Sequence, residues 1–130
     1  MPSDEFLNIP IFHTTYAYIA ASSTWYRQCP KIHRHGIVHY CYILGLDFFK
    51  TLLRANAEMG YKKLAHLREA SLLLDQLKIF LRLAKDAEAL TPKHYIQLQV
   101  MLQDIGKQLG GWIKSLQTKG PAQSGSVREI

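Results

Sequence analysis

The chain has 130 residues and 48% of them are hydrophobic, which is enough for one core and excludes wholesale disorder. Sixteen Lys and Arg against ten Asp and Glu give a net charge of +6, which favours anionic partners but is also compatible with an ordinary basic soluble protein. Asp4 and Glu5 stand where a secretory signal would carry Lys or Arg, so we expect a cytoplasmic protein with no signal peptide and no membrane span.

Residues 1–10 are polar and contain two prolines, which predicts a flexible leader. The first predicted helix runs from Ile11 to Gln28. Its face recurs at helical spacing as Phe12, Tyr16, Ile19, Ser23 and Tyr26. Cys29-Pro30 ends this helix, because the residue before a proline is pushed out of the α region.

The second predicted helix extends from about His35 to about Met59, and Gly60 suits its C-terminal cap. Its apolar seam consists of Ile37, Cys41, Leu44, Phe48 and Leu52. The third predicted helix extends from about Tyr61 to about Ala89. Its seam consists of Leu67, Ala70, Leu74, Leu77, Leu81 and Ala84. Both seams have the alternating spacing of a helix that packs lengthwise against other helices.

The fourth predicted helix opens at Thr91-Pro92, where Thr caps free amide groups and Pro is tolerated at the first helical position. Its seam consists of Leu98, Leu102, Ile105, Leu109, Trp112 and Leu116. Short connections make neighbouring helices antiparallel. We therefore predict an all-α fold, an up-down-up-down antiparallel four-helix bundle over residues 11–118, with a flexible tail at 119–130.

The second and third helices carry more apolar residues than one bundle core needs. The surplus predicts self-association through a surface that we define as Val38, Tyr42, Phe49, Leu53, Leu72, Ile79, Phe80 and Leu83. The alternative is a single thick core with some exposed aromatic residues.

Basic residues recur at helical spacing on three of the predicted helices. Lys78, Arg82 and Lys85 follow one another at i, i+4 and i+7, and Lys50 and Arg54 form a shorter row. The fourth helix adds Lys107, Lys114 and Lys119. Rows of cations at this spacing follow a phosphate backbone, with salt-sensitive binding that is largely independent of base sequence. The alternative is a solvated helix face.

Two further patterns could carry chemistry. His35 and His39 are one helical turn apart, but a third ligand is missing, so no metal site is predicted. Arg34 and His39 match the Arg-x4-His spacing of HEPN-type ribonucleases, in which Arg would hold a phosphate and His would assist proton transfer. Cys29 and Cys41 are expected to be buried and reduced. No phosphate loop, carboxylate pair or nucleophile elbow is present, and no cofactor is predicted.

The segment LTP…IGKQLGGWIKSL…KG resembles the accessory variability determinant (Avd) family of bacterial diversity-generating retroelements. The matching elements are Thr91-Pro92, Gly106-Lys107, Leu109-Gly110, Trp112-Ile113 and Lys119-Gly120. Pro30-Lys31 with His35-Gly36 resembles the family's first turn, and QLKIFLRL at Gln76–Leu83 resembles its third-helix motif. The resemblance covers about residues 11–120. The first helix differs from the family pattern, because it is almost uncharged.

The resemblance implies a protein that is not an enzyme. It implies a homopentamer of four-helix bundles that binds RNA and DNA and associates with the retroelement reverse transcriptase during mutagenic cDNA synthesis. Lys78, Arg82, Lys107 and Lys119 match basic positions of the family. The alternatives from the residues are a protein-interaction bundle without a nucleic-acid role, and a ribonuclease that uses Arg34 and His39.

Overall fold

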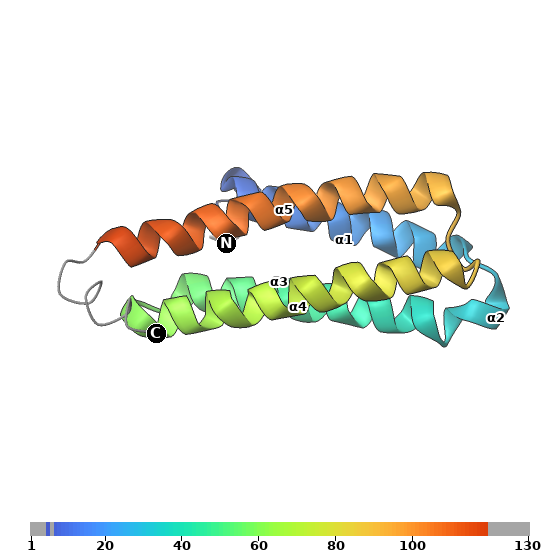
Figure 1. Ribbon diagram of the computed structural model, residues 1–130, viewed down its shortest axis with the longest axis horizontal. Coiled ribbons are helices and arrows are strands. Elements are labelled where there is room, and N and C mark those ends of the chain that lie inside the picture. Colours follow the sequence, from blue (N-terminus) through green and yellow to red (C-terminus); the bar gives the residue numbers. More distant parts are fainter. Residues whose placement is uncertain (1–4, 6, 120–130) are drawn as a thin grey trace.

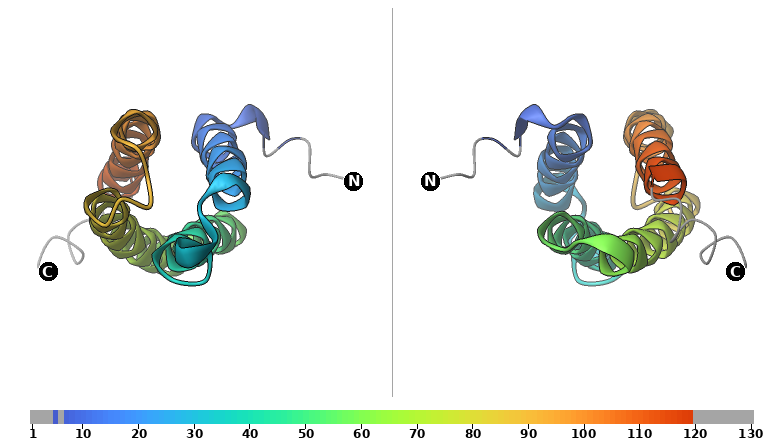
Figure 2. Two further views of the ribbon diagram at one scale, coloured as in Figure 1. Left: turned by 90° about the vertical axis from the view of Figure 1, so that its right-hand side faces the viewer. Right: turned by 90° about the vertical axis from the view of Figure 1, so that its left-hand side faces the viewer.

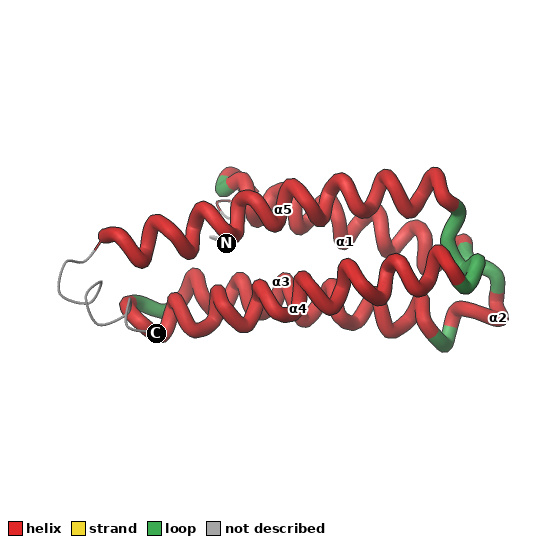
Figure 3. Tube along the Cα trace, viewed as in Figure 1, coloured by secondary structure: helices red, strands yellow, loops and turns green. Residues whose placement is uncertain are grey.

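A computed structural model describes residues 5 and 7–119 and contains five helices there. They are α1 (Pro10–Gln28), α2 (Lys31–Arg34), α3 (Ile37–Ala57), α4 (Gly60–Asp86) and α5 (Pro92–Lys119), joined by short loops (Figure 3). The four long helices agree with the sequence prediction to within a few residues at each end. The short helix α2 was not predicted. Residues 1–4 and 6 of the predicted leader and residues 120–130 of the predicted tail lie outside the described residues.

The long helices run antiparallel to one another, in the predicted up-down-up-down order (Figure 1). The connection through α2 and the α4–α5 turn lie at one end of the bundle, and the α3–α4 turn lies at the other. Each long helix contacts two others: α1 contacts α3 and α5, and α4 contacts α3 and α5. The end views show this order, with α3 and α4 side by side and α1 and α5 above them (Figure 2). Within the described residues there is no strand.

The core confirms the predicted seams of α4 and α5. Every seam residue of α4 is buried, and on α5 Leu98, Leu102, Ile105 and Leu109 are buried while Trp112 and Leu116 pack at its edge. On α3 the buried row contains Cys41, Leu44, Phe48 and Leu52, as predicted.

The predicted face of α1 was only partly correct: Phe12 is buried and Ile19 and Tyr26 pack against the core, but Tyr16 was assigned wrongly. Tyr16 is 54% exposed, and the buried row consists of Ile11, Phe12, Thr15, Tyr18, Ser22 and Trp25. Thr15 and Ser22 enter the core because their hydroxyls donate to backbone carbonyls one turn back, at 2.7 Å and 3.0 Å. A search for apolar residues alone misses hydroxyl side chains that satisfy themselves in this way.

One residue of the predicted self-association surface was also wrong. Val38 is fully buried inside the bundle, because it lies on the side of α3 that faces the core. Tyr42, Phe49 and Phe80 are partly buried. Leu53, Leu72, Ile79 and Leu83 are exposed, and Ile79 is the most open of them at 67%. The rings of Tyr40 and Phe80 meet edge to face across α3 and α4 at 5.0 Å.

The ends of the helices have local causes. Thr91 caps α5, since its hydroxyl accepts a hydrogen bond from the His94 amide at 3.1 Å. At the end of α4 the Ala89 amide donates to the Ala84 carbonyl and the Glu88 amide donates to the Lys85 carbonyl. This is a Schellman motif, and its left-handed position is occupied by Glu88 with φ of 64°. Gly60 also has a positive φ, and it begins α4 instead of capping α3.

Candidate nucleic-acid interface

Two of the predicted basic residues meet in a groove between α4 and α5. Lys78 from α4 and Lys107 from α5 both line it, and its volume is about 400 Å³. The other lining residues are Ser71, Leu74, Asp75, Gln103, Gly106, Leu109 and Gly110. The two lysines are far apart in the sequence. Only the packing of α4 against α5 brings them to one place.

Gly106 makes room for the side chain of Lys78. A Cβ atom at Gly106 would lie 3.4 Å from Lys78 Nζ and 3.5 Å from Leu74 Cδ2. The ammonium group therefore rests against the backbone of α5. Nearby, Gln99 Nε2 donates to the Lys78 carbonyl at 3.5 Å and to the Tyr95 hydroxyl at 2.9 Å. These contacts tie α5 to α4 just beside the groove.

Lys85 lies farther along α4 and is partly neutralised. Its Nζ is 3.7 Å from Asp86 Oδ1 and 4.8 Å from the centre of the Tyr95 ring. The Asp86 pair is exposed to solvent and weak, whereas the ring contact holds the Lys85 stem against α5. Arg82, between Lys78 and Lys85, is exposed. The row Lys78, Arg82 and Lys85 thus follows the border between α4 and α5.

Most of these cations have no acidic partner. Over residues 5 and 7–119, ion pairs within 4.0 Å join only Lys85 with Asp86 and His66 with Glu69. Lys78 and Lys107 share their groove with one carboxylate, that of Asp75. Since exposed charges attract polyanions when no nearby acid neutralises them, the groove keeps a net positive charge.

The remaining predicted basic residues lie elsewhere. Lys50 and Arg54 are exposed on α3, which packs between α1 and α4, so they are not part of the groove. Lys114 is exposed on α5 one heptad beyond Lys107. Lys119 ends α5, and the position of its side chain lies outside the described residues.

Two other features of the bundle could not be predicted from the sequence. Lys63 Nζ lies 5.8 Å from the centre of the Trp112 ring, at a cavity of about 510 Å³ where the start of α1 meets α5. This cation–π contact joins α4 to α5. A separate polar pocket lies between α1 and α5, lined by Trp25 and His94 among others. In both cases the residues come from distant segments, so no spacing rule could have found them.

The residues of the ribonuclease alternative have structural roles. Arg34 Nη2 donates to the carbonyls of Arg27 and Cys29, at 3.1 Å and 3.4 Å, and so caps the end of α1. His39 Nδ1 shares a hydrogen bond of 2.8 Å with the Tyr26 hydroxyl. No hydrogen bond joins Arg34 to His39 in the part of the chain that the structure covers. Arg34 therefore stabilises the C-terminal end of α1, and His39 links α3 to α1.

The two cysteines are free and buried, as predicted. Burial raises the pKa of the Cys41 thiol to about 12 and also raises the pKa of the neighbouring Tyr18 phenol. Both groups sit in the core and not at the groove. Among the described residues, no group of three His, Cys, Asp or Glu side chains is placed to hold a metal ion. None of the helices in this part of the chain combines the length and the hydrophobicity of a membrane span.

Comparison with known proteins identifies one family. The family model described as bAvd-like matches residues 14–116, a stretch that begins in α1 and ends in α5. The match therefore includes all four long helices and both sides of the α4–α5 groove. Comparison with curated proteins gives no match to this chain.

Proposed function

Because this chain belongs to the bAvd-like family, the accessory variability determinants of bacterial diversity-generating retroelements, we propose that it binds the nucleic acids of such a retroelement through the α4–α5 groove and associates with its reverse transcriptase. The family consists of non-catalytic accessory proteins. In this role the chain holds the template RNA and the growing DNA near the polymerase, and it performs no bond chemistry itself.

The convergence of Lys78 and Lys107 on one groove carries the proposal. Their ammonium groups come from two helices, and Asp75 is the one carboxylate among the residues that line the groove. Arg82 and Lys85 continue the positive charge along α4. A groove of this kind contacts phosphates and not base edges, so binding is strong at low salt and largely independent of sequence.

Self-association multiplies these contacts. We assign it to the exposed residues of the predicted surface, Leu53, Leu72, Ile79 and Leu83, with the partly buried Tyr42, Phe49 and Phe80 around them. Exposed leucine and isoleucine side chains gathered on α3 and α4 favour burial against a second copy. In a homopentamer, five weak grooves become one avid surface on which a single strand is held several times.

The test is the salt dependence of binding. Fluorescence anisotropy of a labelled oligonucleotide, measured over a series of salt concentrations, is expected to give an affinity that falls steeply and linearly on logarithmic axes. Copurification with a coexpressed reverse transcriptase of a diversity-generating retroelement tests the second half of the proposal. A protein that retains the polymerase but shows no affinity for nucleic acid at low salt is a protein-interaction bundle, and the groove then has another partner.

A further inference from the structure

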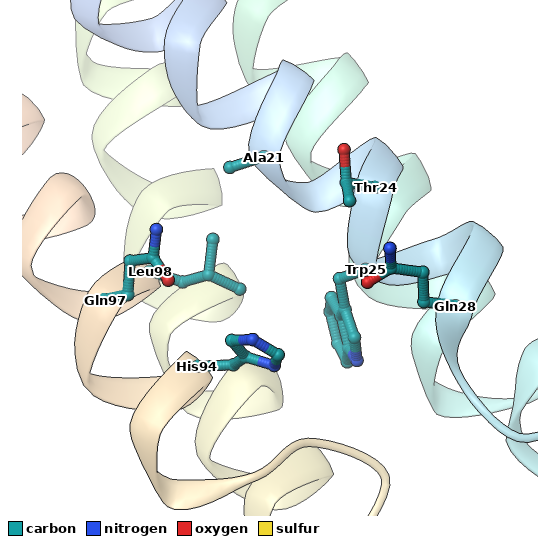
Figure 4. Close-up of a pocket in the computed structure, with 7 residues that line it drawn as sticks. All are labelled: Ala21, Thr24, Trp25, Gln28, His94, Gln97 and Leu98. Carbon is teal, nitrogen blue, oxygen red and sulfur yellow. The ribbon is translucent and has the colours of Figure 1, made fainter.

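The pocket between α1 and α5 has the composition of a binding site. It is lined by Ala21, Thr24, Trp25, Gln28, His94, Gln97 and Leu98, and its volume is about 260 Å³. Pockets for drug-sized ligands measure about 300–1,000 Å³, so this one suits a single small planar group. The indole of Trp25 and the imidazole of His94 project toward each other from the two helices (Figure 4).

Trp25 is held rigidly as one wall. Its indole Nε1 donates to the Ala89 carbonyl at 3.0 Å, and Ala89 is itself fixed by the Schellman motif that ends α4. The residue is 8% exposed, so most of its surface is packed inside the bundle, and it also lines the pocket. An aromatic surface that does not move loses little entropy when a second ring stacks on it.

The other groups offer free hydrogen-bonding capacity. Gln28, His94 and Gln97 are exposed, and within the described residues their side chains make no hydrogen bond. Each amide presents one acceptor and an NH₂ donor, which is the pattern that pairs with the edge of a nucleobase. Gln28 and Gln97 stand on opposite helices at the rim (Figure 4).

The charge near the pocket is positive. Arg27 donates to the hydroxyls of Ser23 and Thr24, at 3.1 Å and 3.4 Å, and this holds its guanidinium at the side of the pocket where Thr24 lies. None of the lining residues is acidic. His94 belongs to the first turn of α5, where the free amide groups of the helix add positive potential.

We propose that this pocket holds one unpaired nucleobase of a single strand, stacked on Trp25 and His94 and contacted at its edge by Gln28 and Gln97. Arg27 then meets the adjoining phosphate. The inference rests on the proposed function and adds to it a preference for single strands, because a base inside a duplex cannot enter. The pocket and the groove flank α5 on its two sides. Leu98 and Lys107 are about 14 Å apart along the helix axis, so one strand crossing α5 reaches both sites.

The fluorescence of Trp25 provides the test. In the variant Trp112→Phe it is the sole tryptophan, so its quenching reports stacking at this pocket. We expect quenching by a single-stranded oligonucleotide, and none by a duplex of the same sequence or by a single strand of abasic sites. Anisotropy of the same labelled strands is recorded in parallel, since it reports binding by the groove as well.

A paired substitution tests the contacts on α5. His94→Ala with Gln97→Ala is expected to weaken single-strand binding about 5-fold and to leave duplex binding unchanged. Gln76→Ala, an exposed glutamine on α4 away from the pocket, is the matched control and is expected to change neither. All three side chains are exposed, so folding is expected to be retained.

The outcomes separate the two proposals. Quenching confined to base-bearing single strands, with selective loss in the His94 and Gln97 variant, supports the pocket. Salt-dependent binding without quenching, or equal quenching by the abasic strand, overturns the pocket and leaves the groove intact. Quenching by a free nucleoside monophosphate at the concentration needed for the oligonucleotide overturns the assignment to a strand. Absence of any binding overturns both.

Discussion

Replacing Lys78 and Lys107 together by alanine removes both cations that line the α4–α5 groove. Lys107 is exposed and Lys78 is partly exposed, so the bundle is expected to fold normally. The effect on binding follows from counterion release. Each phosphate contact on a single strand contributes about 0.7 to the slope of log affinity against log salt. Losing two contacts therefore makes this negative slope less steep by about 1.4.

The same change in slope gives the loss of affinity at a chosen salt concentration. Because the electrostatic contribution vanishes near 1 M salt, the variant is expected to bind about 25-fold more weakly at about 0.1 M and almost equally at about 1 M. This holds for one protomer on a short oligonucleotide. The fluorescence anisotropy titration, repeated over a salt series, measures both the slope and the convergence.

The matched control is Lys62→Ala with Arg68→Ala. It removes two exposed cations from α4 that do not line the groove. The change of net charge is therefore the same as in the Lys78 and Lys107 variant. If the two double variants lose affinity equally, binding follows net charge alone and the groove has no special role. An unchanged slope in the Lys78 and Lys107 variant refutes the reasoning outright, provided that circular dichroism shows an intact helical fold.

Three further substitutions test separate parts of the structure. Ile79→Glu places a charge on the most exposed residue of the predicted self-association surface, so sedimentation should show smaller particles, whereas Gln76→Glu on the same helix should leave the mass unchanged. Glu88→Gly relieves the left-handed conformation at the end of α4 and is expected to raise the free energy of unfolding by about 1 kcal/mol, measured by urea denaturation. Ala87→Gly, at a negative φ, should give no such gain. Burial raises the pKa of Cys41 from 9.0 to about 12, so its contribution to stability is complete below pH 9 and is lost as the pH rises toward 12. Wild type should therefore lose more stability over this interval than Cys41→Ala, and an identical pH dependence would contradict the raised pKa.

The repeated apolar spacing in the sequence was sufficient to predict the fold. The seams of α4 and α5 were predicted residue by residue, because leucine at alternating intervals of three and four leaves one orientation in which the whole row is buried. Thr91-Pro92 and Cys29-Pro30 mark helix boundaries by local chemistry, which needs no partner. The same locality explains why the basic row Lys78, Arg82 and Lys85 could be recognised at all.

The prediction failed where the spacing of apolar residues along the chain does not report what a side chain contacts. Thr15 and Ser22 lie in the core because each hydroxyl bonds to its own helix, whereas Tyr16 turns outward. Val38 is buried because α3 packs against both α1 and α4, and the spacing along α3 cannot say which side each neighbour covers. Arg34 donates hydrogen bonds to carbonyls at the end of α1, and its spacing to His39 in the sequence does not reveal these contacts.

The amino-acid sequence by itself determined four amphipathic helices, their order and their excess of positive charge, because helical periodicity, capping and net charge are properties of neighbouring residues. The meeting of Lys78 with Lys107 and of Trp25 with His94 was decided only by the tertiary structure. Each of these pairs joins residues from separate helices, and their distance depends on how the bundle places one helix beside another. A groove or a pocket exists only after that packing is complete.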